Sequence, residues 1–352
     1  MSSKSHDVVV IRGDGIGPEI VDATLTVLAS TGVALDTVDV VAGEAAIAEV
    51  GEPLPQATLE AMADVGVTLK APLISPASTG PIELSFRGRQ VRHPSMNPGL
   101  RMALELYANE RRLKSFPGVG SFAGDMDMVV VRETSEGAYS GLGHRIGDVA
   151  AESIRLTTRK ATERIMRFSF DLARRTGRRK VTVGHKANVM PEADGFFLEI
   201  AEEIALDNSD IIFDELRIDA LGAACVSHPA DLDVVVLENQ YGDVISDVAG
   251  AVVGSIGLAP GVNYGDGTAV FEASHGAAPD IAGRGLANPI ALVLSAVSML
   301  EHLGEGPAAE AVEGAVTDLL AEGRVLTPDL GGRSSTQEVA DELARLVRAR
   351  AS

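Results

Sequence analysis

The chain has 352 residues, 45% of them hydrophobic, and a formal net charge of −20 at pH 7. This length can bury a large core divided between two lobes, whereas the negative charge argues against nucleic acid or an anionic membrane as a partner. The single cysteine, Cys225, excludes an internal disulfide and favours a reducing compartment. The polar start, Met1–Asp7, lacks the apolar core of a signal peptide, and no apolar run approaches the roughly 20 residues that span a bilayer. We therefore expect a cytoplasmic protein.

The first part of the chain alternates short strands with helices, which indicates an open α/β sheet. The strand Val8–Ile11 leads into Gly13-Asp-Gly-Ile-Gly-Pro-Glu, with Pro18 placed to begin a helix that runs to about residue 30. The glycines do not complete a dinucleotide-binding fingerprint, because Pro18 occupies the third glycine position. We interpret this segment as a tight turn from strand to helix. A helix near Gln56–Ala63 and the strand Val67–Lys70 follow.

A long stretch rich in glycine, proline and serine, Ile74–Pro94, contains Arg87, Arg89 and Arg92. It is long for a connection in an α/β protein, so it is either functional or mobile. Two interpretations stay open. The arginines, together with Arg112, form a lid over an acidic group of a substrate, or they balance neighbouring acids on a solvated loop.

Three arginines stand at the ends of predicted elements rather than along one exposed face. Arg101 and Arg111 lie in a stretch predicted to be helical up to Arg112, and Arg132 follows the strand Met128–Val131. Because arginine forks bind carboxylates in bidentate fashion, these residues are candidates for holding an anionic substrate. The alternative is three ordinary surface arginines.

The middle of the chain supplies a candidate proton carrier. A helix is predicted over Thr158–Thr176, and the strand Lys180–Gly184 then leads to Lys186. A lysine at a strand end in apolar surroundings can have a lowered pKa and carry a proton, although a surface lysine is the more ordinary interpretation. A further strand, Ile211–Asp219, ends in an acid.

Two carboxylates follow the buried strand Asp231–Val236. Asp243 and Asp247 are four residues apart in a helix predicted from Gly242 through Val252, so they share one helical face. Adjacent carboxylates repel each other unless a cation lies between them, and such hard oxygen ligands suit Mg²⁺ or Mn²⁺. A solvated helix face is the alternative.

The last informative stretch, Ala269–Pro289, is rich in small residues, which allow a flat ligand to approach the backbone closely. Beyond it two or three helices of structural type are predicted, over Pro289–Leu303, Ala308–Glu322 and Thr336–Arg350.

Four of these blocks together resemble the β-decarboxylating dehydrogenases, the family of isocitrate, homoisocitrate and 3-isopropylmalate dehydrogenases. They are Gly13–Glu19, His185–Met190, Tyr241–Asp247 and His275–Pro289, which stand in the family's order. The segment His-Pro-Ser-Met-Asn-x-x-Leu-Arg is most similar to NAD-dependent isocitrate dehydrogenase. The isopropylmalate enzymes carry apolar residues where Ser95 and Asn97 stand here.

The resemblance implies an α/β protein with a two-lobed isopropylmalate dehydrogenase-like fold. The large, cofactor-binding lobe would comprise residues 1–106 and 255–352, and the small lobe residues 107–254. A clasp at about residues 137–160 would be exchanged between the two subunits of a homodimer with shared active sites.

The resemblance also implies NAD and either Mg²⁺ or Mn²⁺ as cofactors. Asp219 and Lys186 would come from the neighbouring subunit, and the carboxylate of Asp280 would favour NAD over NADP because it repels a 2′-phosphate. The implied residues are, for proton handling, Tyr139 and Lys186; for the substrate, Ser95, Asn97, Arg101, Arg111 and Arg132; for the metal, Asp219, Asp243 and Asp247; and for NAD, Glu272, His275, Gly276, Ala277, Ala278, Asp280, Ile281 and Asn288.

The function implied is oxidative decarboxylation of a 3-substituted malate, with isocitrate, which would yield 2-oxoglutarate, as the leading substrate. Two departures from the family pattern are Arg112 and Glu238, each in place of a proline. Together with the arginine-containing loop, they leave open homoisocitrate or a malate whose 3-substituent ends in another anion, such as a phosphonate. A non-catalytic regulatory subunit is a further alternative. The tyrosine, lysine and aspartate positions are all retained, which favours an active enzyme.

Overall fold

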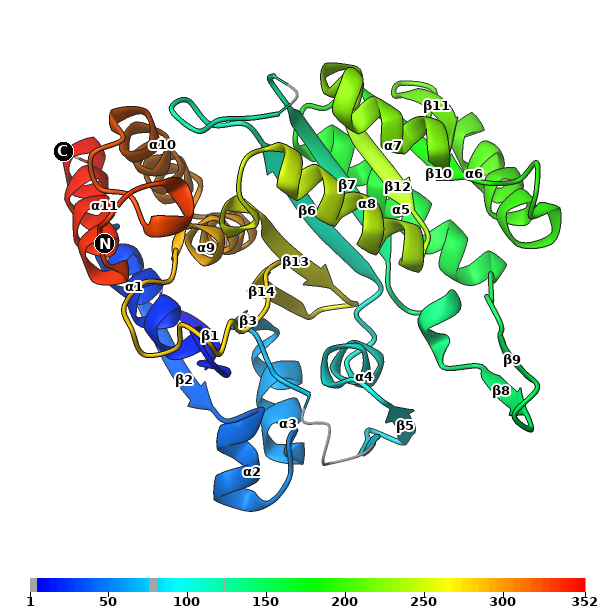
Figure 1. Cartoon of the computed structure of the whole chain (residues 1–352), viewed down its shortest axis with the longest axis horizontal. Helices are drawn as coiled ribbons and strands as arrows, with labels where there is room; N and C mark the ends of the chain where they lie inside the picture. Colours follow the sequence, from blue (N-terminus) through cyan, green and yellow to red (C-terminus); the bar gives the residue numbers. More distant parts are fainter. Residues whose placement is uncertain (1–4, 76–80, 123, 352) are drawn as a thin grey trace. The chain divides into compact units, whose positions relative to one another are not determined.

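The computed structural model describes residues 5–75, 81–122 and 124–351 and shows two compact units, each built from segments distant in the sequence (Figure 1). Unit 1 runs to Leu104, includes Phe116–Gly120, and resumes at Gly254; unit 2 comprises Glu105–Ser115 and Ser121–Val253. The predicted α/β fold class is confirmed. The segment Phe116–Gly120, which the sequence placed with the middle of the chain, groups with unit 1. Its Gly118 lies so close to the α10 backbone that a Cβ there would meet the Leu320 carbonyl oxygen at 2.2 Å.

The strands of unit 1 follow the order β13-β14-β3-β1-β2. All neighbours are parallel except β13 and β14, which are antiparallel. Residues of β3, β13 and β14 are buried along their whole length, as expected for strands covered on both faces. The bounds are β1 (His6–Ile11), β2 (Leu35–Val40), β3 (Val67–Lys70), β13 (Pro260–Tyr264) and β14 (Ala269–Ala273).

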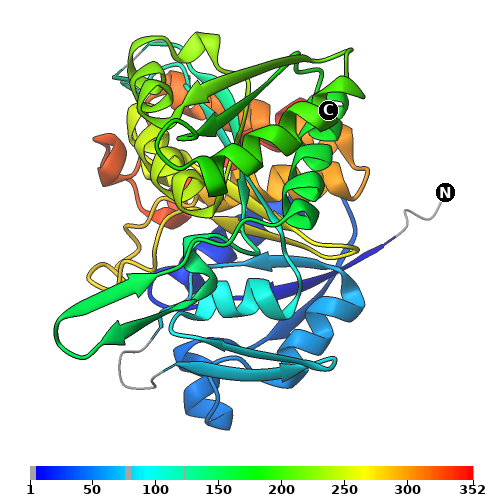
Figure 2. The ribbon, with the colours of Figure 1, turned by 90° about the vertical axis from the view of Figure 1, so that its right-hand side faces the viewer.

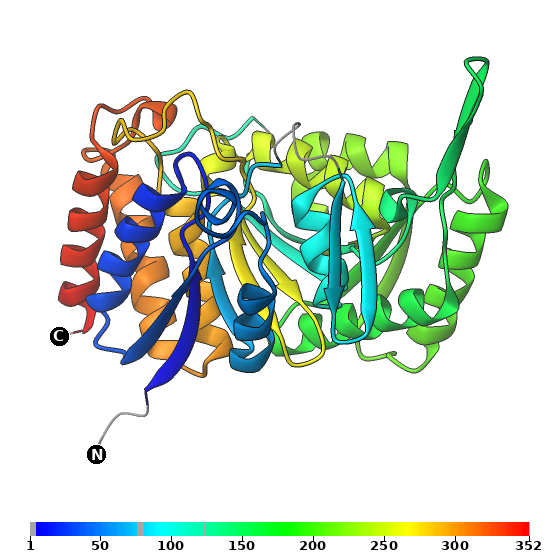
Figure 3. The same ribbon diagram turned by 90° about the horizontal axis from the view of Figure 1, so that it is seen from below.

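The helices of unit 1 bury a continuous apolar surface. Residues 290–300 of α9 are all buried, and α1, α10 and α11 lie side by side (Figure 3). Pro18 stands in the first turn of α1, as predicted. No helix within the described ranges is long and apolar enough to cross a membrane. The bounds are α1 (Gly17–Ala29), α2 (Glu44–Val50), α3 (Gln56–Val65), α4 (Met96–Ala103), α9 (Ile290–His302), α10 (Gly306–Glu322) and α11 (Thr336–Ala351).

Much of the predicted long loop is instead an antiparallel hairpin, β4 (Ile82–Phe86) and β5 (Arg89–His93). Residues 76–80 of the loop lie outside the described ranges. The turn is formed by Arg87 and Gly88, which both have positive φ angles of 46° and 82°, the combination that a two-residue hairpin turn requires. Arg87 pairs with Asp64 of α3 at 2.5 Å, and Arg92 pairs with Glu83 across the hairpin at 3.2 Å. These ion pairs favour the interpretation in which the arginines balance neighbouring acids.

The strands of unit 2 follow the order β11-β10-β12-β7-β6, parallel except for β6, which is antiparallel to β7. The strand bounds are β6 (Ala108–Lys114), β7 (Asp127–Glu133), β10 (Lys180–His185), β11 (Ile212–Arg217) and β12 (Val234–Leu237). The helices are α5 (Arg159–Arg175), α6 (Phe196–Leu206), α7 (Ile218–Ser227) and α8 (Asn239–Val252).

Three sequence predictions in this region were wrong. The helix before Arg111 stops at Ala103, because Glu105 has a positive φ of 53° that ends it, and residues 108–114 form β6. Arg112 therefore lies in β6 of unit 2, where it pairs with the buried Glu110 at 2.7 Å, and it does not belong to the hairpin. Asp219 lies in the first turn of α7 and does not end a strand. The helix predicted from Gly242 begins at Asn239.

The segment predicted as a clasp forms a second hairpin, β8 (Gly143–Ile146) and β9 (Ala150–Ser153). It extends away from the rest of unit 2 as an arm, seen in Figures 2 and 3. At its base Leu156 forms a β-bridge with Gly137, so the arm's return segment is joined to the loop that carries Tyr139.

Candidate active site

The site in unit 2 is built on the first turns of α8. Glu238 caps the helix: its carboxylate accepts hydrogen bonds from the backbone N–H groups of Tyr241 (2.8 Å) and Gln240 (3.1 Å). Asp243 and Asp247, one turn apart, have 34% and 57% of their side chains exposed. The helix thus presents two carboxylates on one face, as the spacing predicted.

Two buried arginines converge on these carboxylates. Arg132 of β7 forms an ion pair with Asp243, and Arg111 of β6 lies 2.7 Å from Asp247 and 3.6 Å from Asp243. Asn239 holds the Arg132 guanidinium through two hydrogen bonds of 3.0 and 2.8 Å to its Oδ1. The arginine crosses α8 so closely that a Cβ at Gly242 would lie 2.5 Å from it. Glycine is therefore required at this position.

Tyr139 completes this group. Its hydroxyl donates a hydrogen bond of 3.1 Å to Asp243 Oδ2, and the Arg132 guanidinium lies 5.6 Å from the centre of its ring. Burial, and then the negative charge of Asp243, raise the pKa of Tyr139. The phenol therefore stays protonated at neutral pH and can act as a proton donor.

Lys186 and Asp219 pair with each other, at 2.5 Å between Nζ and Oδ1. The hydrogen bond from Lys186 lowers the pKa of Asp219. Among residues 5–75, 81–122 and 124–351, no three histidine, cysteine or acidic side chains lie close enough together to hold a metal ion. Within one chain, therefore, Asp219 is not close enough to Asp243 and Asp247 to bind the same metal ion.

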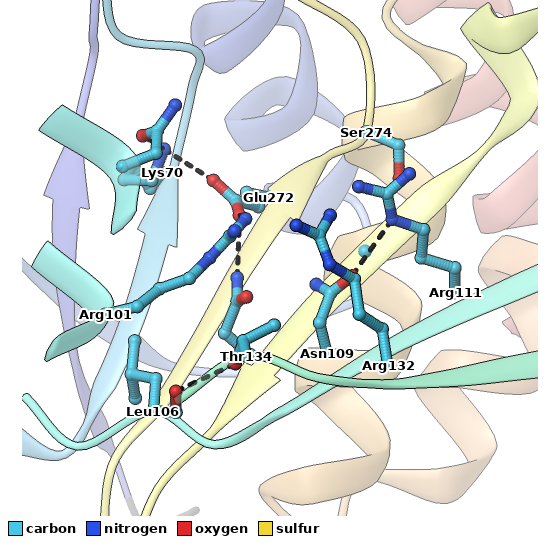
Figure 4. Close-up of polar contacts among 12 residues, drawn as sticks. Lys70, Arg101, Leu106, Asn109, Arg111, Arg132, Thr134, Glu272 and Ser274 are labelled. Carbon is cyan, nitrogen blue, oxygen red and sulfur yellow. Dashed lines mark hydrogen bonds and ion pairs between the residues drawn. The ribbon is translucent and has the colours of Figure 1, made fainter. Parts of the chain in front are cut away.

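In unit 1 a buried acid holds one predicted substrate residue, Arg101. Lys70 of β3 and Arg101 of α4 converge on Glu272 of β14 at 2.5 and 3.2 Å (Figure 4). Burial alone would raise the pKa of Glu272, but Lys70, followed by Arg101, outweighs it and lowers the pKa to about 2. Asn97 of α4 turns its Oδ1 toward Lys70 Nζ at 3.4 Å. Glu272, predicted to bind NAD, is thus occupied by an internal ion pair.

The other predicted substrate residue of α4, Ser95, stands immediately before the helix. Its backbone N–H donates to Nδ1 of the buried His93 at 3.0 Å. This hydrogen bond holds the residue at the first turn of α4, the element that also carries Asn97.

The predicted NAD loop lies beside the glycine-rich turn after β1. The Ala277 carbonyl accepts a hydrogen bond of 2.9 Å from Ile16, and a Cβ at Gly15 would lie 2.0 Å from that oxygen. Ala278 adopts a φ of 39° next to it, while Gly276 and Asp280 are exposed and Ile281 is partly exposed. Close approach of two backbone segments therefore explains the glycine at position 15.

Two polar side chains of this loop have defined orientations. His275 Nδ1 lies 3.0 Å from the Gly276 carbonyl, so Nε2 is the unprotonated acceptor, and it is buried without a partner in the described ranges. Burial lowers the pKa of His275, so the ring is neutral. Asn288 donates to Asp329 at 3.0 Å and accepts from the backbone N–H of Ile290 at 3.0 Å.

Sequence reasoning missed several residues that organise the site. Lys70 was noted only as a strand end, yet only 1% of its side chain is exposed. A lysine that closes an otherwise apolar strand was the available signal. No signal in the sequence pointed to Asn239, which orients Arg132, or to Arg155, which is discussed below.

Comparisons with known proteins identify the family of the chain. Residues 7–343 match the family model "Isocitrate/isopropylmalate dehydrogenase". The chain is 42% identical to a 3-isopropylmalate/3-methylmalate dehydrogenase of Methanocaldococcus jannaschii, covering 97% of this chain and 99% of that one. It is 39% identical to a regulatory subunit of the mitochondrial NAD isocitrate dehydrogenase of Dictyostelium discoideum, covering 98% and 93%. The crystal structure of isocitrate dehydrogenase from Methylococcus capsulatus superposes with a TM-score of 0.89 at 44% identity, covering 97% and 99%.

The mixed α/β fold brings arginines of β6 and β7 and the phenol of Tyr139 to the carboxylates of α8, and the matches identify the class of protein as a dehydrogenase. The chain belongs to the isocitrate/isopropylmalate dehydrogenase family, whose members are NAD-dependent decarboxylating dehydrogenases. The enzyme class predicted from the sequence is therefore confirmed.

Proposed function

We propose that the protein is an active enzyme that oxidises and decarboxylates a 3-substituted malate with NAD and a divalent metal, and that isocitrate is its substrate. One observation carries the proposal: Arg111, Arg132 and Tyr139 all reach the Asp243 carboxylate. Cations for substrate carboxylates, an acid for a metal ion and a phenol for proton transfer are thereby assembled around one helix, α8.

The residues divide the chemistry between them. When bound, NAD would accept a hydride from C2 of the substrate, and a divalent ion would stabilise charge on the C2 oxygen. Lys186 would take the proton of the C2 hydroxyl. After CO₂ leaves, Tyr139 would deliver a proton to C3, a role that its raised pKa supports. Arg111 and Arg132 would hold the carboxylates of the malate portion.

The donor set fits Mg²⁺ or Mn²⁺ in part. Asp243 and Asp247 supply carboxylate oxygens on one exposed helical face, and such oxygens suit both ions. Two carboxylates from one chain leave the coordination incomplete, so Asp219 of a second copy is the expected third ligand.

The orientation of Asn97 supports isocitrate. Because its Oδ1 faces Lys70, its amide N–H groups are left to donate to an anionic group of the substrate. Ser95, at the start of the same helix, adds a hydroxyl. Two such donors suit the third carboxylate of isocitrate better than an apolar substituent. Homoisocitrate or a phosphonate-bearing malate would satisfy the same donors and remains the alternative.

The loop after β14 supports NAD. His275 Nε2 is a buried acceptor without a partner in the described ranges, which suits an amino donor such as that of adenine. The exposed carboxylate of Asp280 would accept hydrogen bonds from free ribose hydroxyls and would repel a 2′-phosphate.

The proposal is tested by NADH formation from isocitrate, homoisocitrate, 3-isopropylmalate and malate in the presence of Mn²⁺. We expect isocitrate to have the highest kcat/KM. We also expect NAD to exceed NADP by at least about tenfold, or about 1.4 kcal/mol. A higher kcat/KM for a longer or phosphonate-bearing malate would reassign the substrate, and a preference for NADP would contradict the role of Asp280. No turnover with any of them would favour a regulatory subunit.

We further propose that the functional form is a homodimer with shared sites. Unit 2 exposes large apolar side chains on α7 and α8 and on the arm, and such patches mark contact surfaces. A second copy is the proposed occupant, because it would also bring Lys186 and Asp219 to the Asp243 group of its neighbour. The residues are Val226, Val244 and Val248 on the helices, and Leu142, Ile146, Val149, Ile154 and Leu156 on and beside the arm.

Mixing two inactive variants tests the shared site. A Lys186→Ala chain and a Tyr139→Phe chain should each be inactive, whereas hybrid dimers contain one site with both intact residues. About a quarter of wild-type activity is expected after random exchange of equal amounts, since half of the dimers are hybrids and each has one of two sites. No recovery after exchange has been verified by native mass spectrometry would show that each site is built from one chain.

A further inference from the structure

Arg155 is a nearly buried side chain to which neither the sequence nor the proposed chemistry assigns a role. It lies between β9 and the bridge at Leu156, and only 10% of its side chain is exposed. Its guanidinium contacts two buried acids, Asp194 at 2.6 Å and Glu238 at 3.1 Å. An arginine fork can hold two carboxylates at once in a fixed geometry, which a lysine cannot.

Each of these acids holds a different part of the candidate active site. Asp194 uses its other oxygen, Oδ2, to accept a hydrogen bond of 2.6 Å from the backbone N–H of Lys186. Glu238 caps the first turn of α8, the helix that carries Asp243 and Asp247. Arg155 thus pairs both with Asp194, which holds the main chain of Lys186, and with Glu238, which caps the start of α8.

Further contacts hold the guanidinium itself in place. It lies 4.4 Å from the centre of the Tyr241 ring, on the first turn of α8. A cation over an aromatic face is attracted to it, more strongly when both are shielded from water. Met190 Sδ lies 3.8 Å from both the Arg155 guanidinium and the Tyr241 hydroxyl. The arginine therefore has little freedom to exchange one carboxylate for the other.

We propose that Arg155 is a positioning residue that locks the main chain of Lys186 to the N-terminus of α8. It would fix the place of Lys186, whose neutral amine accepts the proton, relative to the start of α8 in the same chain. The inference rests on the proposed function, in which Lys186 and α8 of one chain serve two different sites of the dimer. In each chain, Arg155 would then connect Lys186, which serves one site of the dimer, to α8, which serves the other site.

The test replaces Arg155 by methionine and by lysine and uses Arg178→Met as the matched control. Arg178 is similarly sheltered, with 17% of its side chain exposed, and also bridges two acids, Asp127 at 2.5 Å and Asp233 at 2.7 Å. Those acids lie at the starts of strands rather than beside Lys186 or α8. A merely structural arginine should therefore behave like Arg178.

We expect Arg155→Met to lower kcat at least tenfold, with less than a threefold change in KM and a shifted pH profile of kcat. Arg178→Met should lower the melting temperature by a similar amount and keep kcat within twofold. Arg155→Lys, which retains the charge, should recover part of the lost kcat. If Arg155→Met does not fold, Glu238→Gln is measured instead, and it should also lower kcat because the neutral amide no longer pairs with the guanidinium.

The proposal would be overturned if Arg155→Met and Arg178→Met lost the same amount of stability and both kept kcat within twofold of the wild-type value. So would Glu238→Gln at wild-type kcat, or a loss that falls on KM alone. These results differ from a failure of the proposed function, in which the wild-type protein itself would not turn over any 3-substituted malate.

Discussion

Removing divalent cations with EDTA is expected to abolish turnover, and Mn²⁺ or Mg²⁺ should restore it. Asp243 and Asp247 lie on the same face of α8, one turn apart, with Arg132 and Arg111 as their counter-ions, and a metal typically supplies several kcal/mol of transition-state stabilisation. A loss of about 10³-fold or more in kcat, about 4 kcal/mol, is therefore expected. Initial rates across a series of buffered Mn²⁺ concentrations provide the measurement.

Asp243→Asn sharpens this test, because it keeps the size of the side chain and removes its charge. The Mn²⁺ concentration for half-maximal activity should rise at least about tenfold. The matched control is Asp210→Asn, a surface aspartate that also pairs with an arginine, Arg174, at 2.7 Å. It should leave the metal requirement unchanged. Full activity in the presence of chelator would exclude the metal-assisted mechanism.

Lys70→Met is expected to destabilise unit 1 by about 3–5 kcal/mol at neutral pH, because it leaves the buried Glu272 without its nearest cation. The loss should be measurable as a lower urea midpoint. Lys180→Met is the control: its ion pair with Asp214, at 3.6 Å, is partly exposed, and such pairs contribute only about 0–1 kcal/mol. A loss under about 1 kcal/mol for Lys70→Met would contradict the buried-pair interpretation.

The pH dependence of this loss follows from Glu272. Its pKa is about 2 in the folded protein and 4.5 for an ordinary glutamate, so its contribution to stability is present above pH 4.5 and is lost as the pH falls toward 2. The difference in stability between wild type and Lys70→Met should therefore narrow over that interval. Adding Glu272→Gln to Lys70→Met should recover part of the loss at pH 7, because the buried carboxylate that lacks its nearest cation is then replaced by a neutral amide, while Arg101 loses its ion pair.

Local pattern was sufficient for the elements whose residues carry their own signals. The buried strand before α8, the four-residue spacing of Asp243 and Asp247, and Pro18 in the first turn of α1 were all evident from neighbours in the chain. Where two local signals competed, prediction failed. The polar residues of β6 resemble a continued helix, yet Arg111 and Glu110 are buried because Asp247 of α8 and Arg175 of α5 pair with them.

The sequence by itself determined the α/β class and the family blocks, and it supplied the residue types on which the proposed metal-assisted mechanism rests. The tertiary structure alone decided which charges are buried together. Arg101 and Glu272 are 171 positions apart, and Arg132 and Asp243 are 111 apart. Arg155 finds Asp194 and Glu238 only because the arm's return segment lies beside α8. The electrostatic attraction between paired charges is stronger in the protein interior than in water. Neither the burial of a residue nor its partner far along the chain can be inferred from the neighbouring residues in the sequence.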